Sequence, residues 1–236
     1  MGRGFFITGT DTGVGKTLIT GGLATLYKSR GVNVGVMKPI ATGCKRMNND
    51  LISDDAVFLK LSAETDDEYD LINPVRFEQS LAPVVAARLS NSKVDLEKVH
   101  EAFDTLLDRH DMLLVEGIGG LLVPIDEYYF VVDLANELEL PLIVVCRNAL
   151  GTINHTLLTV SYARQHGIEV KGIVINEPCE NNDDILKKTN IDEIRRLTGV
   201  PILGNIPFDK ELDIQSFNKE RVLKIFSDRI SEDIII

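Results

Sequence analysis

A turn rich in glycine and threonine near the start of the chain carries residue types that bind phosphate. Residues 9–17 read Gly-Thr-Asp-Thr-Gly-Val-Gly-Lys-Thr, between an apolar run and an amphipathic stretch. Glycines let consecutive backbone N–H groups face inward, and the positive end of a following helix adds to the attraction for anions. The Lys16 ammonium would neutralise the β- and γ-phosphates of a nucleotide, and the Thr17 hydroxyl would bind Mg²⁺. The turn therefore predicts a nucleoside triphosphate site.

The spacing is that of a Walker A P-loop with one departure. The strict pattern G-x-x-x-x-G-K-[ST] places Thr10 at the first glycine, and Gly9 lies one residue further out. The alternative is a glycine-rich turn with an incidental lysine, which the preceding strand and following helix disfavour.

A carboxylate at the end of another apolar run is a candidate metal ligand. Met112–Glu116 is apolar up to Glu116, and Gly-Ile-Gly-Gly follows at 117–120. This segment resembles a Walker B element with Glu where Asp is commoner, and Mg²⁺ needs only one or two protein carboxylates. The alternative is a solvated strand end, although glycines suit a backbone that approaches a ligand.

Lys38 ends a further apolar run, at the same edge of the predicted sheet. A second lysine beside a phosphate site suggests a second anionic reactant, or negative charge that develops during transfer. The alternative is an exposed lysine before the turn at Pro39, and Thr42 alone would be an ordinary turn residue.

Several other polar positions have a structural interpretation, and one of them has a functional interpretation as well. Ser53 is predicted to cap a helix whose first residues, Asp54 and Asp55, lie near its positive end. Asn154 could simply cap the helix that follows it. Asn176 closes an apolar run, where its amide could read the edge of a purine or only form a turn.

Short apolar runs alternate with amphipathic stretches along the chain, which is typical of βαβ units and a largely parallel sheet. Strands are expected at Gly4–Thr8, Val32–Lys38, Met112–Glu116, Leu142–Cys146, Val170–Asn176 and Ile202–Ile206. Helices are expected at Lys16–Ser29, Leu96–Arg109, Asn154–Gln165 and Asp184–Thr198. We predict an α/β fold of three layers with a doubly wound, mostly parallel sheet, like that of P-loop NTPases. Ligands of such sheets bind beyond the carboxyl ends of the strands, and the irregular region 41–83 could cover that edge.

Composition narrows the class of protein. The 236 residues include 25 Lys+Arg and 36 Asp+Glu, a net charge of −11 that disfavours a nucleic-acid partner. Length and a 44% hydrophobic content predict one domain over residues 1–236. The three cysteines fit neither a disulfide framework nor a zinc ribbon, and the four histidines lack metal-ligand spacing. With no signal peptide and no apolar run near the length of a membrane span, we expect a cytoplasmic protein without a membrane partner.

Five segments taken together resemble the ATP-dependent dethiobiotin synthetases, in order and at matching intervals from Gly4 to about Pro207. They are residues 8–17, Lys38-Pro-Ile-Ala-Thr-Gly43, Val115-Glu-Gly-Ile-Gly-Gly120, Leu150-Gly-Thr-Ile-Asn-His155 and Asn176. The first segment alone would admit a wider clan of P-loop proteins. The second and fourth narrow the resemblance to this family.

The resemblance implies closure of the ureido ring of dethiobiotin from 7,8-diaminopelargonic acid and CO₂, with ATP as co-substrate and Mg²⁺ as cofactor. A carbamate forms on one amine, its oxygen attacks the γ-phosphate, and the second amine displaces phosphate from the resulting anhydride. Lys16 is expected to stabilise the transferring phosphoryl group, and Lys38 to hold the carbamate. The resemblance also implies a homodimer with the diamine at the subunit interface.

The family pattern assigns the site residues by position. The catalytic residues are Thr12, Lys16 and Lys38. The nucleotide ligands are Gly13, Val14, Gly15, Lys16, Thr17, Leu18, Asp55, Glu116, Gly119, Asn176 and Pro207. The diamine ligands are Thr12, Lys38 and Thr42, with Gly151 and Asn154 serving the partner's site. The Mg²⁺ ligands are Thr17, Asp55 and Glu116, with Asp54 as an alternative to Asp55. The family's adenine reader matches Asn176, and Glu177 follows it where relatives can have Asp.

Other functions explain the sequence less well. A switch ATPase for partitioning would carry a signature lysine near the start of the loop, where this chain has Asp11. A related amidotransferase would need a fused glutaminase domain, for which the segment after Pro207 leaves no room. An inactive paralogue would not be expected to keep Lys16, Thr17, Lys38 and Glu116 together.

Overall fold

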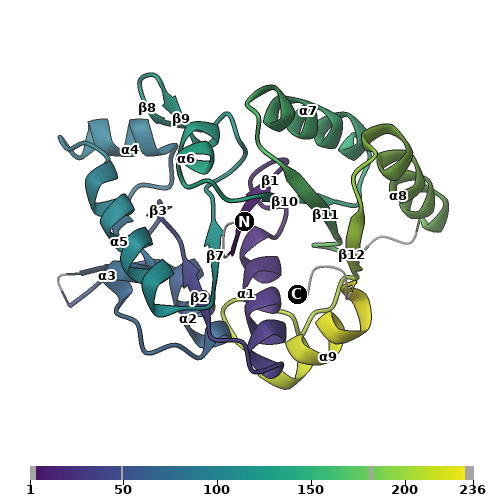
Figure 1. Cartoon of the computed structure of the whole chain (residues 1–236), viewed down its shortest axis with the longest axis horizontal. Helices are drawn as coiled ribbons and strands as arrows, with labels where there is room; N and C mark the ends of the chain where they lie inside the picture. The colour runs from purple at the N-terminus through teal and green to yellow at the C-terminus, as the bar shows by residue number, and fades with distance from the viewer. Residues whose placement is uncertain (1–3, 49, 181–182, 232–236) are drawn as a thin grey trace.

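Six parallel strands form the central sheet of the computed structural model, which describes residues 4–48, 50–180 and 183–231. Across the sheet the strands are β12 (Ile202–Ile206), β11 (Val170–Asn176), β10 (Leu142–Arg147), β1 (Gly4–Gly9), β7 (Met112–Glu116) and β2 (Val34–Met37). The chain runs from β1 to the edge strand β2, returns to β7, and then crosses to β10 (Figure 1). The strand order therefore reverses at β1, and such a reversal opens a crevice at the carboxyl ends of the strands.

Helices cover both faces of the sheet, so the fold has the three layers that the sequence predicts (Figure 1). One face carries α1 (Lys16–Ser29), α2 (Asp54–Ala63) and α9 (Lys219–Arg229). The other face carries α5 (Leu96–Arg109), α6 (Val131–Glu137), α7 (Thr152–Gln165) and α8 (Asp184–Thr198). Neighbouring residues of β1 serve opposite faces, because side chains alternate along a strand: Ile7 packs with α1 and Phe6 with α6, and both are fully buried.

The structure differs from the prediction at the ends of several elements, and it contains the helices α6 and α9, which were not predicted. β2 is shorter at both ends than expected. At its carboxyl end the chain leaves the sheet before Lys38 and Pro39. α7 begins at Thr152 rather than Asn154, since Gly151 has a φ of 90° and makes the turn into the helix. Asn154 therefore lies inside the first turn, and its interpretation as the cap is wrong.

The region 41–83, which was predicted to be irregular, contains short strands and helices. They are β3 (Ile40–Ala41) with β6 (Val75–Arg76), the hairpin of β4 (Lys45–Met47) and β5 (Asp50–Ile52), and the helices α2, α3 (Tyr69–Ile72) and α4 (Pro83–Leu89). Ser53 caps α2 as predicted, with its Oγ accepting from the Ala56 N–H at 3.5 Å. The segment also fixes the backbone of Lys38, whose N–H donates to the Ile72 carbonyl at 2.6 Å. Asn73 Nδ2 donates to the Lys38 carbonyl, also at 2.6 Å.

The C-terminal helix α9 packs on α1 through a close approach at Gly22. A Cβ at that position would lie 2.0 Å from the Phe226 ring, which is fully buried. The Asn218 side chain caps α9 by accepting from the Arg221 N–H at 3.1 Å. The tail, which the sequence left without an assignment, thus closes one face of the core.

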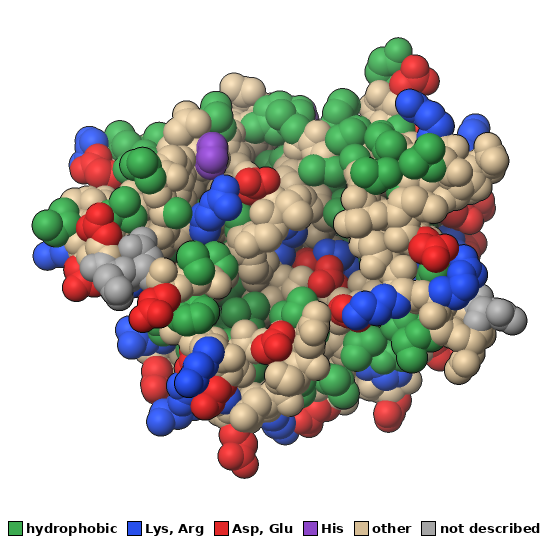
Figure 2. Space-filling model, turned by 180° about the vertical axis from the view of Figure 1, so that it is seen from behind, with side chains coloured by type: hydrophobic (Ala, Val, Ile, Leu, Met, Phe, Trp, Pro, Cys, Tyr) green, Lys and Arg blue, Asp and Glu red, His purple; other side chains and the backbone are tan. Residues whose placement is uncertain are grey.

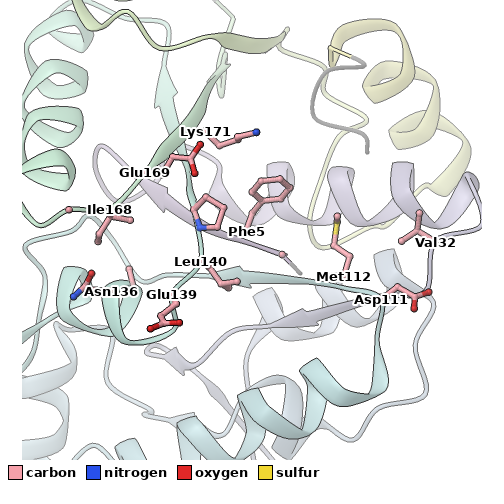
Figure 3. A pocket seen from close by; sticks show the side chains of 14 residues that line it. Phe5, Val32, Asp111, Met112, Asn136, Glu139, Leu140, Ile168, Glu169 and Lys171 are labelled. Carbon is pink, nitrogen blue, oxygen red and sulfur yellow. The ribbon is translucent and has the colours of Figure 1, made fainter. Parts of the chain in front are cut away.

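A cavity of about 870 Å³ opens at the amino-terminal edge of the sheet, opposite the edge where the sequence predicts ligands (Figure 3). Its walls include Phe5, Met112 and Leu140, with Glu169 and Lys171 among the charged side chains around it.

A separate hairpin of β8 (Pro124–Asp126) and β9 (Tyr129–Phe130) precedes α6. None of the helices in the described ranges combines the length and the apolar character needed to cross a membrane.

Candidate active site

Two glycines give the loop between β1 and α1 its shape. Gly13 and Gly15 have φ angles of 74° and 96°, in the left-handed region that favours glycine. A Cβ on Gly15 would lie 2.1 Å from Asn176 Nδ2, so there is no room for a side chain. α1 begins directly after the loop at Lys16, and the first N–H groups of a helix have no partner within the helix. This arrangement suits an anion.

The Lys16 side chain folds back over the loop. Its Nζ donates to the backbone carbonyl of Asp11 at 3.1 Å, and only 6% of the residue is exposed. Burial, and then the nearby Lys38 ammonium, lower the pKa of Lys16 to about 8. Its hydrogen-bond acceptor is a neutral carbonyl, which a phosphate oxygen could replace as a stronger, charged partner.

Lys38 lies at the centre of a buried charged cluster. Its Nζ is 2.6 Å from Glu116 Oε1 and 3.1 Å from Asp55 Oδ2, and it donates to the Gly117 carbonyl at 3.2 Å. Thr17 Oγ1 donates to the same Glu116 oxygen at 2.9 Å. Lys38 and Glu116 are 4% and 1% exposed, so neither is the solvated residue of the simpler interpretation. The neighbouring strands β2 and β7 bring them together.

Charges in this cluster compensate one another only in part, because burial raises the pKa of Glu116 despite the opposing charge of Lys38. Burial acts to lower the pKa of Lys38, but the carboxylates of Glu116 and Asp55 outweigh it, and the pKa is raised. Burial acts to raise the pKa of Asp55, but the Lys38 charge and hydrogen bonds from Lys38 and Thr17 lower it. Lys38 and Asp55 are therefore both charged at neutral pH.

The oxygen atoms around Lys38 form a donor set that fits Mg²⁺. Glu116 Oε2 is buried and has no hydrogen-bond partner in the described part of the chain, which is costly for a carboxylate oxygen. The Thr17 hydroxyl and the partly exposed Asp55 carboxylate lie beside it. Mg²⁺ prefers such hard oxygens and keeps several waters. No cluster of three or more His, Cys, Asp or Glu suited to a metal occurs within the described ranges, so a metal here would depend on two carboxylates and a hydroxyl.

Asp54 lies away from this cluster although it is the neighbour of Asp55. Its Oδ2 is 2.6 Å from the Nζ of Lys45 on β4, and both side chains of this pair are exposed. Successive residues of a helix face different directions. Asp55 is the acid that lies beside Lys38.

Asn176 joins the end of β11 to the phosphate loop. Its Nδ2 donates to the Val14 carbonyl at 2.9 Å, and the residue is 2% exposed. It is therefore more than a turn asparagine, because it supports the phosphate loop from β11, which is separated from β1 by β10. Pro207 is half-buried and follows β12, the strand beside β11.

The loop after β7 also approaches the phosphate loop. Gly119 has a φ of 59°, and a Cβ there would lie 3.4 Å from Thr12 Oγ1. Leu18 is half-buried in the first turn of α1, and Thr42 is half-buried just after β3. Gly151 and Asn154 are exposed at the start of α7, and within the described residues neither is bonded to the Lys38 cluster. The structure thus gathers most of the expected residues and leaves these two at the surface.

Sequence reasoning missed a polar network behind Asn176. Glu177 is 7% exposed and pairs with Lys187 at 2.8 Å, while Asn148 Nδ2 and Asn205 Nδ2 both lie 3.4 Å from its Oε1. The sequence signal that could have revealed this network is that Asn148 and Glu177 directly follow the apolar runs of β10 and β11. Arg147, the last residue of β10, was missed in the same way.

The surface seen from behind Figure 1 is hollowed near its centre, where basic and acidic side chains meet (Figure 2). Hydrophobic side chains gather beside this hollow (Figure 2). The exposed large apolar residues include Leu81 and Leu89 around α4, Leu122, and Leu150 and Leu158 around α7.

Solved structures with a similar fold include cell-division proteins and a ParA family ATPase. A chain of the MinC:MinD cell division protein complex from Aquifex aeolicus has a TM-score of 0.58 at 17% identity, covering 96% of this chain and 88% of that one. A ParA family ATPase from Chlorobium tepidum TLS has a TM-score of 0.56 at 18% identity, covering 96% of each chain. At these identities the likeness shows the fold alone, a three-layer P-loop architecture.

Sequence comparison is more specific. A family model described as an AAA domain matches residues 3–216. ATP-dependent dethiobiotin synthetase BioD of Thermodesulfovibrio yellowstonii is 44% identical over 231 residues, covering 94% of this chain and 93% of that protein. The protein of the same name from Bacillus subtilis strain 168 is 42% identical over 234 residues, covering 99% of this chain and 97% of the other. With such identity over nearly the full length of both relatives, the chain belongs to the family of ATP-dependent dethiobiotin synthetases.

Proposed function

We propose that this protein makes dethiobiotin from 7,8-diaminopelargonic acid, CO₂ and ATP, releasing ADP and phosphate, as a step of biotin biosynthesis. The observation that carries the proposal is the buried Lys38 ammonium. It lies among Glu116, Asp55 and the Thr17 side chain of the phosphate loop, where one cation can face both a nucleotide and a second anion. The names of the relatives support the substrate assignment.

The proposed reaction has three steps. One amine of the substrate attacks CO₂ and loses a proton, which gives a carbamate. A carbamate oxygen then attacks the γ-phosphorus, the bond to ADP breaks, and a carbamic-phosphoric anhydride results. The second amine attacks the anhydride carbonyl and loses a proton to solvent, and phosphate leaves with the oxygen that came from CO₂. Positioning and charge neutralisation supply most of the catalysis in such phosphoryl transfers.

Lys16 and Lys38 each neutralise the negative charge of one of the two reactants. Lys16, buried over the phosphate loop, stabilises the transferring phosphoryl group. Lys38 holds the carbamate and therefore has to exchange its present carboxylate partners for the substrate. Thr12, exposed on the loop and close to Gly119, contacts the diamine, and Thr42 contributes a hydroxyl to the same substrate.

Thr17, Asp55 and Glu116 would hold Mg²⁺, which supplies charge stabilisation at the phosphates. The nucleotide binds along the loop from Gly13 to Leu18 and against Gly119. Asn176 and Pro207 flank the base, which their place at the ends of β11 and β12 supports.

A homodimer completes the site in this proposal. Gly151 and Asn154 are exposed at the start of α7, and they would bind the diamine carboxylate in the partner subunit. The exposure of Leu150 and Leu158, at 90% and 62%, supports an interface on this helix. We further propose that residues 1–236 act as one domain in the cytoplasm, without a nucleic-acid or membrane partner.

Phosphate release from ATP tests the function. We expect release only when the diamine and bicarbonate are both present, with one dethiobiotin formed for each phosphate. Release without the diamine would instead support a switch ATPase, and no release with both substrates would support an inactive nucleotide binder.

A further inference from the structure

We propose that Arg147 is a positioning residue for the triphosphate, which acts by neutralising Asp11 within the phosphate loop. This inference rests on the ATP site of the proposed function. Arg147 is the last residue of β10, and its Nη2 lies 3.1 Å from Asp11 Oδ2. β10 is the direct neighbour of β1, and the Thr10 N–H donates to the Val145 carbonyl at 2.9 Å. The arginine thus reaches the loop from the adjoining strand.

Asp11 is tied into the loop at three points. Its Oδ1 accepts from the Thr12 N–H at 2.7 Å, its Oδ2 pairs with Arg147, and its backbone carbonyl accepts from Lys16 Nζ at 3.1 Å. The carboxylate is therefore a fixed negative charge on the loop that must bind several negative phosphate oxygens. Asp11 also stands where switch ATPases carry a signature lysine, so the sign of the charge at this position is reversed.

The pair contributes more to ligand binding than to folding. The side chains of Arg147 and Asp11 are 40% and 51% exposed, and ion pairs this exposed add little to stability. A charge close to a phosphate still changes binding, because the Coulomb interaction extends over several ångströms. Without Arg147, the Asp11 carboxylate would repel the incoming triphosphate.

Titration calorimetry with Mg²⁺-ATP and with inorganic tripolyphosphate tests the inference on full-length protein. Arg147→Gln should weaken the binding of both ligands about tenfold, because the nearby negative charge of Asp11 is no longer neutralised. Arg147→Lys should keep the affinity within about threefold, because it restores the charge. Arg164→Gln, at an exposed position in the last turn of α7, makes the same change of net charge and should leave both affinities unchanged.

The double variant Asp11→Asn/Arg147→Gln separates neutralisation from direct contact with phosphate. Neutralisation predicts that removing both charges returns the affinity to within about threefold of the wild type. If the double variant binds as weakly as Arg147→Gln, or if Arg147→Gln binds like the wild type, the inference is overturned.

Steady-state kinetics supply a second readout. Arg147→Gln should raise the KM for ATP and leave kcat within about twofold, whereas general damage to the fold would lower kcat and the melting temperature together. A fall in kcat with an unchanged KM would also contradict the inference. Measurements on the wild type distinguish failure of the proposed function from failure of this inference. If the wild type binds ATP but makes no dethiobiotin, the proposed function is wrong, and the titrations still test the role of Arg147.

Discussion

The Lys38 ammonium has two tasks at the scale of the single residue. It compensates the buried Glu116 carboxylate at 2.6 Å, and the proposed reaction also requires it beside the carbamate. Removing one partner of a buried pair leaves an uncompensated charge, which costs about 3–5 kcal/mol of stability. Lys38 is therefore a residue whose loss affects both folding and turnover.

Lys38→Gln should lower kcat by about 10²–10³-fold, because a preorganised charge near the transferring group is lost. The affinity for ATP should stay within about threefold, since Lys16 and the loop backbone remain. Stopped assays of dethiobiotin and calorimetry of ATP binding measure the two effects on protein shown to be folded by circular dichroism. Lys45→Gln, which removes an exposed partner of Asp54, is the control. A defect confined to ATP affinity would remove Lys38 from the chemical step.

Lys16 predicts a pH dependence of nucleotide binding. Burial lowers its pKa to about 8 from 10.5, so about half of the free protein has lost this proton at pH 8. Phosphate binding favours the charged form, so ATP binding should take up nearly one proton at pH 9 and only a small fraction at pH 7. ATP affinity should therefore fall as the pH rises above 8.

Calorimetry in buffers of different ionisation enthalpy measures this uptake. Lys16→Arg should abolish it, because arginine stays charged over this range. Folding has the opposite pH dependence. Between pH 8 and 10.5 the unfolded chain binds more protons at Lys16, so the cost of burying this lysine falls and the free energy of unfolding rises with pH. Equal proton uptake at pH 7 and pH 9 would contradict the assignment.

At the scale of the element, apolar periodicity predicts some bounds and misses others. α1, α5 and α8 have the predicted bounds, as do β7, β11 and β12, because their apolar patterns end at clear polar or glycine signals. α9 was missed because only Val222 and Phe226 are buried in it, a pattern too sparse to recognise. Its partner surface at Gly22 lies on a distant helix that no local pattern can indicate.

Gly22→Ala tests the contact between α1 and α9. The added methyl group would lie 2.0 Å from the Phe226 ring, and overpacking of this kind costs about 1–3 kcal/mol, more than the gain in helix propensity. Urea denaturation should show this loss in the free energy of unfolding. Adding Phe226→Leu should recover part of it. An unchanged free energy of unfolding for Gly22→Ala would show that α9 does not pack there as described.

The candidate site was predictable where a motif specifies its residues. The phosphate loop and Lys38 directly follow strands, Glu116 is the last residue of β7, and the parallel sheet brings such strand ends to one edge. The choice between Asp54 and Asp55 depended on which face of α2 meets β2, and the sequence left it open. The network of Glu177, like the pair of Arg147 and Asp11, joins distant segments and became visible only in three dimensions.

At the scale of the whole molecule, the exposed apolar residues around α7 predict association of two chains. We expect sedimentation at twice the chain mass of 26.2 kDa. Leu158→Glu should shift the protein to a monomer that binds ATP but has a raised KM for the diamine, because Gly151 and Asn154 would no longer reach a partner. Leu197→Glu, at an exposed apolar position on α8, is the matched control. A fully active monomer would contradict the shared site.

The path of one oxygen atom tests the central claim most directly. In the proposed reaction a carbamate oxygen attacks the γ-phosphorus and later leaves with phosphate. With ¹⁸O-labelled CO₂, supplied faster than it exchanges with water, ³¹P spectroscopy of the product should show one labelled oxygen in each released phosphate. Phosphate without the label, formed alongside dethiobiotin, would show that carbon and phosphorus are never joined through that oxygen.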